Sequence, residues 1–285
     1  MQTIYGLVMI LTLYSSFALS EPKDEILNHL LINEVHDLIL QSKVRPMSVK
    51  VAIIGDETSL GEAQYYITKI NPWAQISNYQ IENSLNGTVQ SDGVFNSILY
   101  AIQDGNQVFY IAPSSLSKMS RANFIEIMKW FEALDLIMVS SGYISLNKDP
   151  TFIKIPEETF KNHFVMVCVA NSINSILLNN EYNLNNMLIC GPKPNIENSE
   201  DSVLYYADDV SSSAIVASGL SLLLALNTQL KPPQLMGLMS LSADQIEYKI
   251  FSFSNIKPSI NIKKAVELVL EPPLDLLREV LKFKY

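Results

Sequence analysis

The sequence of 285 residues is poor in histidine, cysteine and basic residues, and each shortage excludes a class of site. The two cysteines have no histidine beside them, which leaves too few ligands for a metal centre, so we expect no metal. Lysine and arginine total 20 against 29 aspartate and glutamate residues, which gives a net charge of −9. Nucleic acid is therefore not an expected partner, because binding its phosphates requires clustered positive charge.

The sequence also lacks an apolar run long enough to cross a membrane. Residues 1–20 carry no charged side chain, and their apolar middle, from Ile4 to Tyr14, is shorter than the ~20 residues that a bilayer requires. Small residues precede Glu21, so we predict a secretory signal peptide over residues 1–20. The lack of lysine or arginine near the amino end favours an uncleaved anchor as the alternative. We expect a secreted chain with no stable membrane insertion after cleavage.

Secretion would bring the two cysteines, Cys168 and Cys190, into an oxidising compartment. Both lie in apolar runs typical of strands, so they form either one disulfide or two buried free thiols, and the sequence does not decide between these alternatives. Asn86 begins the one glycosylation sequon, Asn-Gly-Thr, and is expected in a loop.

Apolar residues make up 48% of the chain and charged residues 17%, which is enough for a sizeable core. Short apolar runs alternate with segments of helical periodicity, and no linker suggests two domains. This alternation predicts an α/β fold with a mostly parallel sheet and helices on both faces, in three layers. We expect strands at 49–54, 74–81, 107–112, 136–142, 163–170, 187–190 and 248–253, and helices at 23–41, 93–103, 123–134, 232–240, 262–270 and 274–283.

The segment from Asp208 to Leu226 starts with polar and small residues and ends in a run that is apolar on every side. A helix that is apolar all round has no solvent face, so we expect it inside the domain. Serines at its start, Ser211 among them, are good helix caps. Small residues such as Gly219 allow another element to approach closely, and we expect that element to be the sheet.

Functional groups in parallel sheets collect beyond the carboxyl ends of the strands. This rule points to Asp56, Ser114, Tyr143 and the Ser211 region. The glycines after the first strand form no G-x-G-x-x-G motif and no P-loop lysine follows, so no nucleotide cofactor is expected.

The order of these elements resembles that of the subtilisin-like serine proteases (subtilases, the peptidase S8 fold). SSSAIVASGLSLLLALNTQLKPPQLMGLMSLSA, residues 211–243, is similar to the family's G-T-S-M-A-x-P-H-V-A-G segment, which is followed by a helix, a proline-containing turn and a second helix. Further segments match the first catalytic strand, the strand before the oxyanion asparagine, the two strands before the nucleophile and the closing G-x-x-N-x-x-x-A helix, in that order: Val51–Asp56, Ile137–Gly142, Phe164–Asn171, Met187–Pro192 and Ser259–Leu270.

The resemblance divides the chain into a signal peptide, an amino-terminal helical segment, a subtilase-like domain and a carboxyl-terminal helical tail. The boundaries are 1–20, 21–48, 49–270 and 271–285.

The catalytic residues of the family are only partly matched. Ser211 stands at the nucleophile position, in Asp-Val-Ser instead of Gly-Thr-Ser. Gly55 stands at the aspartate position, with Asp56 one residue late, and Tyr143 at the oxyanion asparagine position. Residues 57–80, where the family's H-G-T-H helix should follow, contain no histidine, and the three histidines lie elsewhere; the last of them, His163, is expected on the surface.

A serine hydroxyl needs an adjacent base to become a nucleophile. We therefore expect a pseudo-protease that acts by binding a protein or peptide, with Ser211 as a helix cap. The alternative is a divergent serine endopeptidase that uses Ser211 with Asp56 and another base. A third interpretation is an unrelated doubly wound binding protein, which would gain if Ser211 lay far from any cleft.

Overall fold

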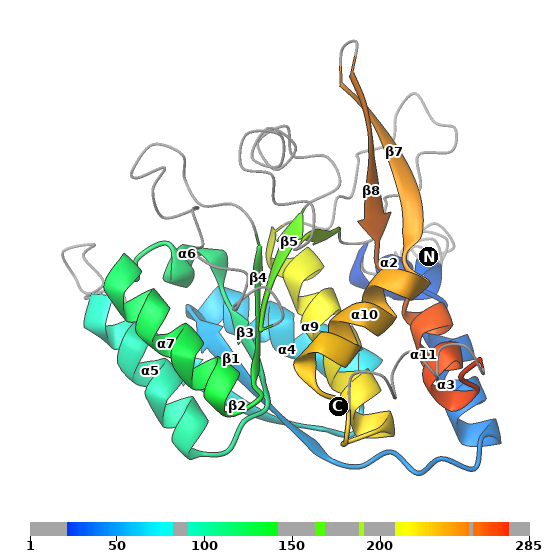
Figure 1. Cartoon of the computed structure of the whole chain (residues 1–285), viewed down its shortest axis with the longest axis horizontal. Coiled ribbons are helices and arrows are strands. Elements are labelled where there is room, and N and C mark those ends of the chain that lie inside the picture. The colour runs from blue at the N-terminus through cyan, green and yellow to red at the C-terminus, as the bar shows by residue number, and fades with distance from the viewer. Residues whose placement is uncertain are drawn as a thin grey trace, which may run out of the picture.

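The computed structural model of the chain describes residues 22–81, 91–141, 163–168, 188–190, 209–250 and 253–273. These residues build one eight-stranded sheet in the order β2-β1-β3-β4-β5-β6-β8-β7 (Figure 1). All neighbouring strands are parallel except the β7–β8 pair. The strands are β1 (Val49–Gly55), β2 (Ala74–Gln80), β3 (Val108–Ile111), β4 (Ile137–Ser141), β5 (Phe164–Cys168), β6 (Leu188–Cys190), β7 (Asp244–Ile250) and β8 (Phe253–Ser259).

Helices cover both faces of this sheet (Figure 1). They are α2 (Pro22–His29), α3 (Ile32–Gln41), α4 (Glu57–Ile70), α5 (Ser91–Gln103), α6 (Pro113–Leu116), α7 (Arg121–Ala133), α9 (Asp209–Leu226), α10 (Pro232–Ser242) and α11 (Ile262–Leu270). One core cluster joins α5 and α7 to one face of the sheet. The other joins α4 and α9 to the opposite face and also includes buried residues of α3, α10 and α11. The three-layer α/β prediction is therefore confirmed.

The strands separate these two cores because successive side chains point to opposite faces. In β1, Ile53 belongs to the α4/α9 core and Ile54 to the α5/α7 core, and both are fully buried. Burial on both faces explains why the central strands are unbroken apolar runs in the sequence.

Helix α9 is buried along its length, as expected from its apolar sequence: every residue from Ser211 to Leu226 is buried. Ser221 accepts a hydrogen bond from the side chain of Asn71, which follows α4, at 3.0 Å. A Cβ on Gly219 would lie 3.3 Å from Ile260 and 3.5 Å from Ile262. The element that approaches Gly219 is therefore the α11 region and not the sheet, contrary to expectation.

The amino-terminal segment forms two helices, so the prediction of one helix over 23–41 is wrong. Leu31 adopts a left-handed conformation, with φ of 55°, between α2 and α3. The break turns Leu30 and Ile32 into the core and leaves Leu31 41% exposed. A straight helix would have buried Leu31 on its inward face.

Three other local predictions need correction. The segment expected as a single strand at 248–253 belongs to the β7–β8 hairpin, which projects beyond the rest of the sheet (Figure 1). Helix α4 was not expected from the pattern of residues 57–70. His163 is only 6% exposed, and its Nδ1 donates a hydrogen bond to the carbonyl oxygen of Leu136 at 2.8 Å. His163 is buried because it pairs with Leu136, just before β4, a contact that the local sequence does not indicate.

Cys168 and Cys190 are register partners on β5 and β6. The signal peptide, Asn86, Tyr143 and the expected helix at 274–283 lie outside the described residues. In the described part of the chain, no helix combines the length and the apolar character needed to cross a membrane.

Candidate functional site

The candidate site lies at the carboxyl edge of the sheet, where α4 and α9 both begin. Helix α4 follows β1 after a single residue, and it packs along α9. The parallel strands end at this same edge, so polar residues from distant parts of the chain lie along it. The residues concerned are Asp56, Glu62, Ser114, Ser141 and Ser211.

Ser211 is paired with Glu62, a residue that the sequence analysis did not single out. The Ser211 hydroxyl donates a hydrogen bond to Oε1 of Glu62, and only 4% of the Ser211 surface is exposed. Glu62 lies in the second turn of α4 and is half-buried. Helix α9 begins at Asp209, so Ser211 lies inside the first turn and not at the expected N-cap.

The position of Glu62 on α4 explains why it reaches α9. Ser59, Ala63 and Tyr66 form the buried face of α4. Glu62 is adjacent to that face, because residues three and four apart are neighbours on a helix surface. Glu62 lies in the part of the sequence where the resemblance places the family's histidine helix. Its position there is the sequence signal that could have identified it as a partner of Ser211.

Asp56 is engaged in holding the start of α4. Its Oδ1 accepts a hydrogen bond from the backbone N–H of Ser59 at 2.9 Å, which makes Asp56 the N-cap. Its Oδ2 accepts a second hydrogen bond from the Ser114 hydroxyl at 3.2 Å. Partial burial acts to raise the pKa of Asp56, but these hydrogen bonds and the charge of Lys118 outweigh it, so the pKa lies below 3.8.

Gly55 occupies a position with no room for a side chain. A Cβ on Gly55 would lie 2.8 Å from the Cβ of Ala112 and 3.3 Å from that of Ser59. Contacts under 3.0 Å require something to shift, and here the nearest atom is a short, rigid side chain. The family's aspartate position is therefore closed by the packing of β1 against the end of β3.

Ser141 adds a buried hydroxyl at the end of β4. It is 2% exposed, and its Oγ has no hydrogen-bond partner among the residues that the structure describes. By strand alternation it shares the face of Val139, which belongs to the α4/α9 core. The neighbouring Ser140 is satisfied, because its hydroxyl donates to the carbonyl oxygen of Ile111 at 2.8 Å. Ser141 thus lies in the same layer as Ser211 and Glu62.

The histidines whose side chains are described bind backbone far from this edge. His36 Nε2 donates to the carbonyl oxygen of Ile70 at 3.1 Å, at the end of α4. His163 pairs with Leu136, before the start of β4. Within the described residues, no three histidine, cysteine, aspartate or glutamate residues are grouped so that they could hold a metal ion.

Comparison with known proteins gives the fold. Neither a protein-family model nor a curated protein matches the sequence. A lanthipeptide protease matches with a TM-score of 0.55 and 11% identity, over 82% of this chain and 92% of that chain. The self-cleaved protease domain of PatA matches with a TM-score of 0.52 and 11% identity, over 78% and 96%. The epidermin leader peptide processing serine protease EpiP from Staphylococcus aureus matches with 0.50 and 11%, over 85% and 80%.

All three neighbours are proteases by name, and EpiP is named a serine protease. At this level of identity the likeness concerns the fold alone. The expected α/β fold is therefore confirmed, and the chain has a protease-like fold.

Proposed function

We propose that this chain is a secreted pseudo-protease, a subtilisin-like domain that binds a peptide or protein segment without hydrolysing it by a Ser-His-Asp mechanism. The observation that carries the proposal is the hydrogen bond from Ser211 to Glu62. A glutamate stands beside the serine where the family resemblance calls for a histidine. Residues 1–20 support secretion through their signal-peptide pattern.

The chemistry of the site supports loss of neutral-pH hydrolysis. A general base is most effective when its pKa lies near the working pH, and carboxyl groups ordinarily titrate far below imidazole. Asp56, the residue that would orient such a base, is also occupied by other hydrogen bonds. Asp56 caps α4 and binds Ser114. The position one residue earlier, Gly55, has no space for an aspartate side chain.

Peptide binding is the activity that such a domain retains. EpiP is named for processing a leader peptide, which supports a peptide as the ligand class here. The Ser141 hydroxyl, which is buried and has no hydrogen-bond partner among the described residues, lies at the same edge as Ser211.

A fluorophosphonate probe tests this proposal, because it labels only activated serine nucleophiles. We expect the purified protein at pH 7 to label no more than its Ser211→Ala variant. Labelling that disappears in the variant would overturn the pseudo-protease. Amino-terminal sequencing of the secreted protein tests the other part of the proposal and should find Glu21 first.

The Ser211–Glu62 hydrogen bond also favours a second candidate, a serine endopeptidase with Glu62 as its base. In this scheme the Ser211 Oγ attacks the peptide carbonyl carbon while the Glu62 carboxylate accepts the hydroxyl proton. Glu62 then gives that proton to the amine nitrogen as the C–N bond breaks. Water, deprotonated in turn by Glu62, hydrolyses the ester on Ser211 and restores both side chains.

The pH dependence of labelling distinguishes this candidate. A histidine base loses activity as it protonates near its ordinary pKa of about 6.5, whereas a carboxylate base continues to work at pH 5. The second candidate therefore requires labelling of Ser211 at pH 5 that Glu62→Gln abolishes. Glu57→Gln, an exposed residue of the same helix, is the matched control and should change nothing.

A further inference from the structure

Four register partners form a row across β5, β6, β8 and β7, where the β7–β8 hairpin joins the parallel part of the sheet. Cys168, at the end of β5, is the partner of Cys190, at the end of β6. Cys190 is also the partner of Ser259 on β8, and Ser259 is the partner of Asp244 on β7. We call these four residues the hairpin row. Whatever holds this row together also holds the hairpin against the rest of the sheet.

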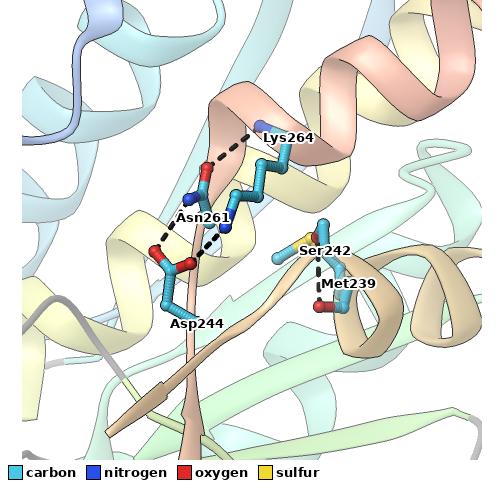
Figure 2. A network of polar contacts seen from close by, with 5 residues as sticks. All are labelled: Met239, Ser242, Asp244, Asn261 and Lys264. Carbon is cyan, nitrogen blue, oxygen red and sulfur yellow. Dashed lines mark hydrogen bonds and ion pairs between the residues drawn. The ribbon is translucent and has the colours of Figure 1, made fainter.

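The Asp244 end of the hairpin row is held by a polar network (Figure 2). Asp244 accepts hydrogen bonds from the Asn261 side chain at 2.7 Å and from Lys264 Nζ at 2.5 Å. Asn261 Oδ1 accepts from the backbone N–H of Lys264 at 2.9 Å and so caps α11. At the end of α10, Ser242 donates to the carbonyl oxygen of Met239 at 3.2 Å. The start of β7 is therefore tied to the start of α11.

Strand β6, in the middle of the hairpin row, has few backbone pairs. It is three residues long, and among the described residues it pairs with β5 at three positions and with β8 at one. The two strands of the hairpin pair with each other at seven positions. A single backbone hydrogen bond contributes little net stability, because it replaces hydrogen bonds to water. The ladder alone therefore attaches the hairpin to β5 only weakly.

The two cysteines lie at this same place. Neighbouring strands are about 4.7–4.9 Å apart, which is within the ~4.4–6.8 Å between Cα atoms that a disulfide spans. Register partners also share a face of the sheet, as a bond between them requires. Cys168 and Cys190 are the only cysteines in the sequence, so the fold places each one opposite its sole possible partner within the chain.

We propose that Cys168 and Cys190 form a disulfide bond, which anchors the β7–β8 hairpin, through β6, to the parallel part of the sheet. The bond closes the connection between β5 and β6, residues 169–187, into a loop. Closing a loop restricts the unfolded chain and so stabilises the folded one. The proposal rests on the proposed secretion, which supplies an oxidising compartment, and not on peptide binding at Ser211.

The bond forms by exchange with a disulfide oxidant of the secretory compartment, either glutathione disulfide or an oxidised protein dithiol. One cysteine thiolate attacks a sulfur of the oxidant, whose other sulfur leaves and takes up a proton. The second cysteine thiolate attacks the protein sulfur of this mixed disulfide, which forms the Sγ–Sγ bond and releases the remaining oxidant sulfur to take up the other proton. Two electrons pass from the cysteines to the oxidant, which becomes the reduced thiol form.

Counting free thiols tests the bond directly. The purified full chain is incubated with glutathione disulfide, unfolded without reductant and treated with N-ethylmaleimide, and its intact mass is measured. We expect no maleimide adduct and no bound glutathione, and an adduct on each of the two cysteines when the chain is reduced first. Adducts without prior reduction, retained glutathione, or a disulfide-linked dimer on non-reducing electrophoresis would overturn the proposal.

This test uses purified protein and an added oxidant, so its failure is distinguishable from a failure of secretion. Amino-terminal sequencing of the secreted protein measures secretion alone. A chain that oxidises in the test tube but is not secreted would keep the bond and lose the proposed localisation.

Thermal melts with and without reductant measure the stabilisation. We expect dithiothreitol to lower the Tm of the oxidised wild type by about 5–10 °C, because opening the loop restores freedom to the unfolded chain. The double variant Cys168→Ala/Cys190→Ala is the matched control, and its Tm should not respond to dithiothreitol. An equal shift in both proteins, or no shift in the wild type, would contradict a stabilising bond.

Hydrogen exchange shows what the bond anchors and requires no variant. Reduction of the wild type should speed amide exchange in β6 and β8 by about tenfold or more, because strands that lose an anchor open locally. Strand β1 is separated from β5 by β3 and β4 and should keep its exchange rates. Unchanged exchange in β6 and β8 would show that the bond does not anchor the hairpin, and the proposal would be wrong.

Discussion

The end of β1 and the start of α9 meet at one edge of the sheet, yet their polar residues serve different ends. At the end of β1, Asp56 caps α4 and binds Ser114, while Gly55 is enclosed by Ala112. At the start of α9, Ser211 directs its hydroxyl to the side chain of another helix. The Asp56 carboxylate therefore stabilises the start of α4, which follows it directly in the sequence. The Ser211 hydroxyl instead binds a residue that is 149 positions away.

The difference teaches how a functional edge can change while its fold persists. A carboxylate next to a helix start finds backbone N–H groups to bind, because the first turn leaves them unpaired. A serine near the start of a buried helix can donate to a carbonyl of its own helix, as Ser213 does to Val210, but Ser211 donates to Glu62 on a neighbouring helix. The three predictions below change one region at a time, beginning with the largest effect.

The largest effect is expected at Gly55. In Gly55→Ala the new methyl group would lie 2.8 Å from the Cβ of Ala112, so β1 or β3 must shift. We expect the free energy of unfolding to fall by ~1–3 kcal/mol, the usual cost of overpacking a core. Urea unfolding measures it. A variant as stable as the wild type would show that the β1 end is less closed than the packing indicates.

Two companions sharpen this experiment. Gly55→Ala combined with Ala112→Gly should be more stable than the sum of the single changes predicts, because the clash is removed. Gly61→Ala lies in the same stretch, inside α4, and its new Cβ would meet nothing within 4 Å. It should instead raise stability by ~0.5–1 kcal/mol through helix propensity.

A smaller effect is expected at Asp56. Asp56→Ala removes the cap of α4 and should cost ~1 kcal/mol at pH 7. The pKa of Asp56 is lowered by folding, so the charged form contributes stability above pH 3.8 that is lost as the pH falls through the folded-state pKa. The difference between the wild type and this variant should therefore shrink in acid, as measured by thermal melts from pH 7 to pH 2.

Asp56→Asn separates the cap from the charge. Asparagine caps helices about as well as aspartate, so stability at pH 7 should be nearly retained. The acid-dependent part of the stability should be lost, because asparagine does not titrate. An unchanged pH profile in Asp56→Asn would mean that this carboxylate does not account for it.

The smallest effect is expected at the Ser211–Glu62 pair. Ser211→Ala should cost about 0.5 kcal/mol, because Glu62 is half-buried and water can replace the lost donor. Combined with Glu62→Gln in a double-mutant cycle, it should give a coupling energy of similar size by chemical unfolding. Strictly additive changes would argue against a direct hydrogen bond.

The sequence was sufficient for the architecture because burial on both faces leaves a plain signal. Runs such as Ile137–Val139 and the apolar segment 211–226 identify central strands and a central helix without knowledge of their neighbours. The start of a helix could be predicted where a proline marks it, as Pro232 marks the start of α10. Leu31 was misplaced, because nothing in its local sequence signals a left-handed residue.

The site was only half predictable, because its contacts are long-range. Ser211 could be found from its surroundings, whereas Glu62 lies 149 positions away and is not the residue type that the resemblance calls for. Once α4 is known to begin at Glu57, the role of Asp56 follows from a local rule, since aspartate is a preferred N-cap. The closure of Gly55 depends on Ala112, which no local pattern relates to it.

The burial of α9 has a consequence for motion. A helix that is covered on all sides, and tied through Ser221 to Asn71, has no face along which it can detach alone. Its amide hydrogens should exchange with solvent only when the whole domain unfolds. The Ser211 region is therefore attached to the slowest-opening part of the molecule, so any adjustment to a ligand must come from the elements that face α9 across the edge.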